Sequence, residues 1–412
     1  MTNEKIINII NWAMLYALAS LVVPVLPTHA LLYYVILVGA TGYVLHCRQE
    51  RIDLRVVLIV LACVLSIVLN DPPALFKSWG RFGLFFLMLI VASPLCQNEK
   101  INTLRLKLFE GVMTVIGIIT ILSCLAYFLG IDLTIRPKGV TNLFFGGLTG
   151  NSMLLAVCTG LSVLYSFNLL LHRQYSRKYK KLHIAWLCVF LLASFLCLLL
   201  SGSRGAAIST IAGMLLLLYK QNKENVARFF LYIVILGALG TVTFTLWEPY
   251  TKALVEKQRG NDISGSATAS RDNKWEARID EFKSSPIFGI GFSAVDLQNK
   301  GDYMETEGIV ETGTSWGGML SMIGLMGFIP FLLLYAHSVW LLLIDEKCPY
   351  FSGLLAAVLC WFSVHMIVEG YVLAGGSFLC FILWLTIGAA SAYHKLVCKQ
   401  EKIKEVNNEV TV

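Results

Sequence analysis

Long apolar segments constrain the fold of this 412-residue chain more than any other feature. A helix needs about 20 mostly apolar residues to cross a bilayer, and twelve segments approach that length. Apolar residues make up 57% of the chain and charged residues only 14%, which is about half the charged fraction of a soluble domain. The sequence therefore predicts an all-α polytopic integral membrane protein with about 12 transmembrane helices. An ordinary soluble enzyme and a disordered chain are excluded.

The predicted spans are approximately 6–26, 30–46, 54–70, 78–95, 108–130, 148–171, 182–201, 204–219, 228–246, 316–343, 350–369 and 371–394. Lysine and arginine cluster on alternate connections, most densely at residues 173–181, while the other connections carry few, mainly Lys77, Arg136 and Lys138. Cytoplasmic loops are enriched in basic residues. Both termini are therefore expected in the cytoplasm and the one long connection, residues 247–315, outside. Most of the net charge of +7 is then a topology signal rather than a sign of nucleic-acid binding.

This connection sets the predicted domain organisation. Residues 1–246 are expected to form transmembrane helices 1–9, and residues 247–315 a periplasmic loop that contains an amphipathic helix. Residues 316–394 are expected to form helices 10–12, followed by a cytoplasmic tail at 395–412. The first apolar run lacks a small-residue cleavage site and is interpreted as a retained span. The eleven cysteines form no CxxC pair and are interpreted as small buried hydrophobes.

The long external loop is unusually rich in cations. Its residues 271–283 predict a helix, in which Arg271, Lys274 and Arg278 are spaced to form one cationic stripe. The stripe is either a solvated loop face or a site for an anionic head group. The apolar face of the same helix would be formed by Trp275, Ile279 and Phe282.

Arginines from other regions are expected at the same outer face. Arg204 lies at the mouth of a span, where a charge is costly unless it is paired, faces a wet cavity or snorkels to the interface. Its guanidinium is suited to bidentate phosphate binding. Arg81 and Arg136 lie near the outer ends of other spans, and Asn151 closes a glycine-rich stretch after Arg136. Together these positions predict a site for a lipid-linked phosphate or diphosphate.

Two carboxylates are candidates for proton transfer. Glu311 precedes the tenth predicted span, and Glu369 lies four residues after His365 on one helix face. Each is either a general base or a structural partner. Trp275 and Trp316 either belong to an aromatic belt at the membrane boundary or stack on sugar rings. The chain has no acidic metal-binding pattern and no HExxH, so neither a metal nor another cofactor is predicted.

The order and spacing of several motifs resemble the bacterial O-antigen ligase and polymerase superfamily. The resemblance covers nearly the whole chain, because the twelve spans and the long loop between the ninth and tenth also match. The matching motifs are Ser201-Gly202-Ser203-Arg204-Gly205 opening a span, Arg271 about fifteen residues before Pro286, the stretch from Pro286 to Phe292, and Gly324-Leu325-Met326-Gly327.

This resemblance implies a glycosyltransferase of the bacterial inner membrane. The implied reaction is an inverting, metal-independent transfer of a glycan from undecaprenyl diphosphate to an acceptor sugar hydroxyl at the periplasmic face. Arg204 and Arg271 would hold the diphosphate and stabilise its charge as it leaves. The expected partners are the lipid-linked glycan, membrane lipids and other assembly proteins such as a flippase or a chain-length regulator.

One departure from the family pattern favours a polymerase. Ligases of this family carry a His-Asn pair at the start of the tenth span, whereas this chain has Gly313-Thr314-Ser315 and no histidine in the long loop. Glu311 becomes the first candidate base and Glu369 the second. A ligase acting on lipid A-core or another acceptor is the alternative. A lipid-linked sugar flippase or transporter is a further one, although the chain shows no two similar halves.

Overall fold

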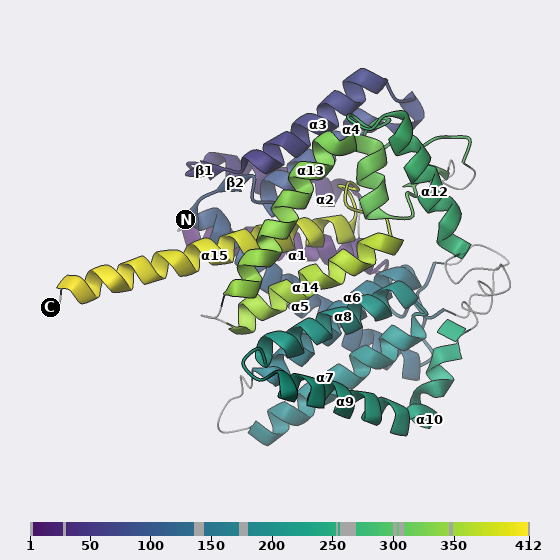
Figure 1. Cartoon of the computed structure of the whole chain (residues 1–412), viewed down its shortest axis with the longest axis vertical. Helices are drawn as coiled ribbons and strands as arrows, with labels where there is room; N and C mark the ends of the chain where they lie inside the picture. The colour runs from purple at the N-terminus through teal and green to yellow at the C-terminus, as the bar shows by residue number, and fades with distance from the viewer. Residues whose placement is uncertain are drawn as a thin grey trace.

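A computed structural model of the chain describes residues 3–27, 30–135, 144–172, 180–252, 254–255, 269–299, 303–304, 309–345 and 349–410. The structure is 78% helical, and the predicted all-α class is confirmed (Figure 1). Each predicted span overlaps one helix. These helices are α1 (Asn3–Val22), α2 (Ala30–His46), α3 (Leu54–Asn70), α4 (Ser78–Ala92), α5 (Glu99–Phe128), α6 (Ser152–Leu171), α7 (Lys180–Leu200), α8 (Arg204–Gln221), α9 (Val226–Val242), α13 (Ser315–Ile344), α14 (Pro349–Val368) and α15 (Phe378–Val410).

The remaining elements are short. Two antiparallel pairs join β1 (Arg51–Ile52) to β2 (Cys96–Gln97) and β3 (Tyr303–Met304) to β4 (Ile309–Val310). The loop expected outside contains the helix α12 (Ala269–Ser284), as predicted. The other short helical pieces are η1 (Ala74–Phe76), α10 (Phe244–Trp247) and η2 (Glu248–Thr251).

The helices confirm a polytopic membrane protein but not the expected number of spans. Within the described ranges, eight helices are long and apolar enough to cross a membrane, and the bent pair Val226–Val242 and Phe244–Thr251 would be a ninth. The helices α2 and α3 are apolar but shorter. The described chain ends lie together on one side of the molecule, opposite α12 (Figure 1).

The core is built around α14 and α15. These two helices are the most enclosed of the candidate spans, with 72% and 78% of the residues in their apolar windows buried. Helix α14 packs against α8, α13 and α15, while α15 also packs against α4 and α5. Trp361 on α14 and Trp384 on α15 are fully buried. The C-terminal end of α14 is therefore fixed from several directions.

A buried arginine caps the end of α4. The last carbonyl groups of a helix have no partners within it, and a cation is favoured there by the helix dipole. Arg105 is 1% exposed and donates to the carbonyl oxygens of Val91, Cys96 and Ile90 at 3.0, 2.8 and 3.2 Å. The Arg105 side chain therefore ties the end of α4 to β2.

A glycine kink joins α13 to the turn after α12. Gly324 has φ 59° and ψ −167°, which interrupts the hydrogen-bond ladder of α13. Backbone groups near this break form hydrogen bonds with the turn instead of within the helix. Two of the motifs that carried the family resemblance therefore meet here. The bonds are Ile290 N to Ser321 O (2.8 Å), Leu325 N to Pro286 O (2.9 Å) and Met326 N to Ile287 O (3.1 Å).

We predict that Gly324→Ala destabilises the protein by about 2 kcal/mol or more, because it combines a strained φ with a clash. An added Cβ would lie 2.3 Å from the carbonyl oxygen of Ile287. The matched control is Gly237→Ala in α9, where no atom lies within 4 Å of an added Cβ. Thermal unfolding of the purified protein in detergent should show a lower melting temperature for Gly324→Ala alone. Equal melting temperatures would contradict the kink's structural role.

Candidate functional site

The last turn of α14 is capped by side chains from two other helices. Carbonyl groups at a helix C-terminus need partners from outside the helix. Helix α12 supplies one of them, and the start of α13 supplies two. The bonds are Trp275 Nε1 to Ile367 O (3.1 Å), Thr314 Oγ1 to Met366 O (3.1 Å) and Ser315 Oγ to Glu369 O (2.7 Å). These bonds hold α12 against the end of α14.

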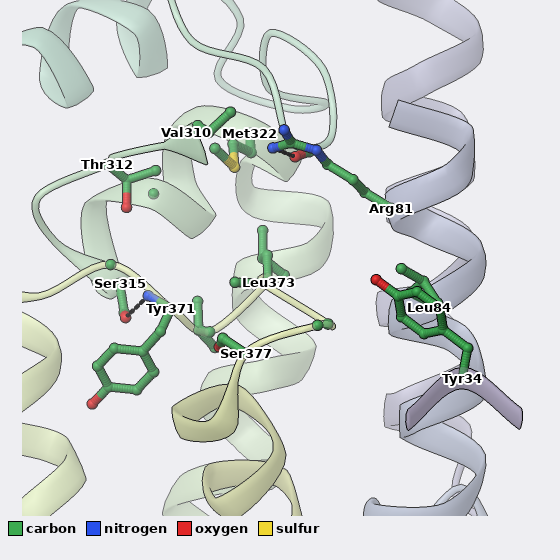
Figure 2. Close-up of a pocket in the computed structure, with 17 residues that line it drawn as sticks. Tyr34, Arg81, Leu84, Val310, Thr312, Ser315, Met322, Tyr371, Leu373 and Ser377 are labelled. Carbon is green, nitrogen blue, oxygen red and sulfur yellow. Dashed lines mark hydrogen bonds between the residues drawn. The ribbon is translucent and has the colours of Figure 1, made fainter. Parts of the chain in front are cut away.

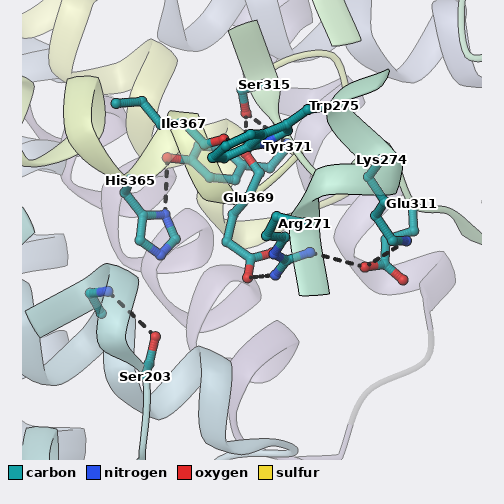
Figure 3. Close-up of polar contacts among 11 residues, drawn as sticks. Ser203, Arg271, Lys274, Trp275, Glu311, Ser315, His365, Ile367, Glu369 and Tyr371 are labelled. Atoms are coloured by element: carbon teal, nitrogen blue, oxygen red, sulfur yellow. Dashed lines mark hydrogen bonds and ion pairs between the residues drawn. The ribbon is translucent and has the colours of Figure 1, made fainter. Parts of the chain in front are cut away.

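This arrangement brings two cations and two carboxylates together (Figure 3). Arg271 Nη2 lies 2.5 Å from Glu369 Oε1, and Arg271 Nη1 lies 3.4 Å from Glu311 Oε1. Lys274 Nζ lies 3.0 Å from the same Glu311 oxygen. We call these four residues the ion cluster. It unites both candidate bases with two of the predicted cations, although they come from three separate parts of the sequence.

The ion cluster remains accessible to solvent. Its four side chains are between 19% and 35% exposed. Ion pairs at that exposure contribute only about 0.2–1 kcal/mol each to stability. Each guanidinium carries five N–H donors, and Arg271 directs two of its nitrogens at carboxylates. The cluster is therefore better suited to binding a charged ligand than to stabilising the fold.

The three cations of the α12 stripe pair with carboxylates of the protein and are partly or fully buried. Arg278 is 1% exposed and forms an ion pair of 2.8 Å with the buried Glu281. Ile279, expected on the apolar face, is 52% exposed. The interpretation of the stripe as a solvated face is therefore wrong. The physical reason is that Glu281, Glu311 and Glu369 compensate the three cations, so the charges can face inward.

The start of α8, which carries Arg204, lies against the same end of α14 as the ion cluster. It begins α8 directly after the N-cap Ser203, whose hydroxyl accepts from the Ala206 amide at 3.4 Å. A Cβ added to Gly205 would lie 2.6 Å from Val368, the last residue of α14 and the neighbour of Glu369 in the chain. The start of α8 thus abuts the same end of α14 that α12 covers.

Other predicted residues lie away from this cluster. Arg81 on α4 donates through Nη1 to the Ser293 hydroxyl (3.0 Å) and lines a separate cavity. Asn151 is the N-cap of α6 and lines a cavity of about 430 Å³ near the end of α1. Trp316 donates to the Ser363 carbonyl at 3.1 Å and packs among aromatic rings. Arg136 lies outside the described residues.

His365 is a buried structural neighbour of the ion cluster. Its ring is 0% exposed, stacks on Trp361 with centroids 4.3 Å apart and shares a hydrogen bond of 3.2 Å between Nδ1 and the Tyr371 hydroxyl. The His365 ring therefore contributes to packing beneath the cluster, and of the two polar residues on this helix face only Glu369 reaches it.

Thr314 and Ser315 were missed as functional positions by the sequence patterns. A signal was present, because a hydroxyl residue directly before a long apolar run is typical of an N-cap. Thr314 does cap α13, accepting from the Gly317 amide at 3.4 Å. The additional bonds of both hydroxyls to α14 depend on tertiary packing and have no local signature.

Residues 188–314 match the family described as O-antigen ligase. The match confirms the resemblance to the O-antigen ligase and polymerase superfamily. It extends from α7 to the N-cap of α13 and includes Arg204, Arg271, Lys274 and Glu311. No curated protein matches the chain. The O-antigen ligase family covers ligases and related polymerases, so the match leaves both reactions open.

Lys274 occupies the space next to the position where O-antigen ligases are expected to carry the His-Asn pair. Gly313 has φ +71°, and an added Cβ would lie 2.5 Å from Cδ and 2.7 Å from Cβ of Lys274. A side chain at position 313 is therefore incompatible with the present position of Lys274. Lys274 and a side chain at position 313 would occupy the same space.

We predict that Gly313→His and Lys274→Ala are strongly non-additive. Gly313→His should lower the free energy of unfolding by about 1–3 kcal/mol, because it overpacks the site and strains the backbone. In the Lys274→Ala background the cost should fall by about 1 kcal/mol, since the clash with Cδ is removed and only the close contact with Cβ remains. Chemical unfolding of the four proteins of this double-mutant cycle measures the coupling. Strictly additive changes would show that the two positions do not compete for space.

Proposed function

We propose that the chain is a polysaccharide polymerase. It would transfer a glycan from undecaprenyl diphosphate to a sugar hydroxyl of another lipid-linked repeat unit at the periplasmic face. The observation that carries this proposal is the ion cluster, in which Arg271 bridges Glu311 and Glu369. Most of its residues lie within the region that matches the O-antigen ligase family.

The cations of the cluster support a donor that carries a diphosphate. Arg271 and Lys274 present a guanidinium fork and an ammonium group on adjacent turns of α12, and Arg204 begins α8 beside them. Phosphate oxygens bind well to such charge-assisted donors. As the glycosidic bond breaks, negative charge grows on the leaving diphosphate, and preorganised cations stabilise that charge.

The carboxylates support proton transfer from the acceptor. The acceptor oxygen would bond to the anomeric carbon while the bond from that carbon to the diphosphate oxygen breaks. The electron pair goes to the diphosphate and the hydroxyl proton to a carboxylate. Glu311 is the better candidate base because it is 35% exposed, against 21% for Glu369.

Position 313 favours a polymerase over a ligase. Glycine and Lys274 fill the place where a ligase would carry its histidine, so acceptor activation must use another group. The ligase reaction, with lipid A-core or another acceptor, is the second candidate because the matching family is described as O-antigen ligase. Both reactions use the same donor chemistry and differ in the acceptor.

A gel of surface glycan from a deletion strain separates the two reactions. Deletion of a polymerase gene should leave single repeat units on the carrier or core, because transfer continues without extension. Full-length polymer that accumulates on the lipid carrier would instead identify a ligase. Normal surface glycan would contradict both candidates.

Variants of the ion cluster should lose activity in the complemented strain. Arg271→Ala should abolish extension, and Glu311→Gln should slow it by about 10²–10⁴-fold, the usual contribution of a general base. The matched control is Arg51→Ala, an exposed arginine of β1 away from the site, which should behave as wild type. Full activity of Glu311→Gln would remove it as the base, and full activity of both Arg204→Ala and Arg271→Ala would exclude the diphosphate site.

A further inference from the structure

A cavity of about 420 Å³ lies beside the ion cluster but is formed by different residues (Figure 2). Arg81 on α4 and Tyr34 on α2 line one side, while Thr312 and the loop that connects α14 to α15 line the other. The Arg81 guanidinium points across the cavity and bonds to Ser293. None of Arg271, Lys274 and Arg204 lines this cavity. Its volume is within the range of small-ligand sites.

The cavity and the ion cluster share one wall. Thr312 and Gly370 line the cavity, and each directly follows a carboxylate of the cluster in the chain, Glu311 and Glu369. The wall is closely packed, because a Cβ added to Gly370 would lie 1.7 Å from the Thr312 hydroxyl oxygen. Ser315 fixes it further by donating to the Glu369 carbonyl and accepting from the Tyr371 amide. Both candidate bases are therefore chain neighbours of residues in the cavity wall, although their own side chains do not line the cavity.

The lining of the cavity suits a sugar ring. Arg81, Tyr34, Ser293 and Thr312 offer hydrogen-bonding groups that can contact several hydroxyls. Apolar surface from Leu84, Val310, Met322 and Leu373 can contact the C–H face of a ring. Among the described residues that line this cavity, no carboxylate is present. A few polar groups within a mainly apolar pocket are typical of sites that fix the orientation of a small ligand.

We propose that this cavity is the acceptor site, which binds the sugar whose hydroxyl attacks the donor. The proposal rests on the proposed polymerase function and adds a second substrate site to it. The donor diphosphate lies on the Arg271 side of the shared wall, and the acceptor sugar lies on the Arg81 side. Glu311 and Glu369 directly precede the two residues of the shared wall, and in this proposal one of the two carboxylates receives the acceptor proton. Arg81 is then a residue of the acceptor site and not of the donor diphosphate site.

Gly376→Leu provides the sharpest test. Gly376 lines the cavity at an exposed position, no atom lies within 4 Å of an added Cβ, and its φ is not in the left-handed region. A leucine there should therefore narrow the cavity at its exposed edge without straining the backbone. We expect this variant to reduce chain extension by about tenfold or more, as a steric block in a substrate pocket does. The control Gly376→Ala should retain most of the activity. Arg81→Ala should also lose chain extension. This variant provides the test if Gly376→Leu fails to fold.

The second readout is binding of undecaprenyl diphosphate, without a glycan, to each purified full-length protein. We expect Gly376→Leu and Arg81→Ala to bind this probe as wild type does and Arg271→Ala to lose it. Full-length polymer from both cavity variants would overturn the acceptor site. Loss of probe binding in both would also overturn it, because the cavity would then belong to the donor site. Retention of probe binding by Arg271→Ala would instead overturn the proposed donor site.

Discussion

The carbonyl groups in the last turn of α14 have no partners within their own helix, and the side chains that satisfy them bring the site together. Trp275 from α12 and the two hydroxyls of Thr314 and Ser315 bond to this turn. Because of these bonds, Arg271 and Lys274 face Glu369 and Glu311 across a few ångströms. A helix C-terminus also favours nearby cations. Capping and charge placement are thus consequences of the same packing.

The fold class could be predicted because a bilayer imposes a length and polarity on every span. Each predicted segment overlaps a helix, and α12 forms where its 3.6-residue pattern indicated. The number of spans is not confirmed, since α2 and α3 are shorter than the candidate spans and α8 is not among them. The inward orientation of the charged stripe could not be predicted. It depends on Glu281, Glu311 and Glu369, whose positions opposite α12 arise only from tertiary packing.

The site was partly predictable for the same reason. Cations near span ends indicated a site for an anionic ligand, but sequence order does not say which of them are neighbours. The structure joins Arg271 to both candidate bases, places Arg81 in a separate cavity and buries Arg278 against Glu281. The cations that the sequence assigned to one face therefore lie in three places, namely the ion cluster, the separate cavity and a buried ion pair.

A structure of the protein with bound undecaprenyl diphosphate would test the role of the ion cluster most directly. We expect the diphosphate oxygens to lie within hydrogen-bonding distance of Arg271 and Lys274, beside the end of α14. Glu311 or Glu369 should then contact solvent or the acceptor and no longer contact these cations. A diphosphate bound elsewhere, with Arg271 still contacting only Glu311 and Glu369, would contradict the proposed donor site.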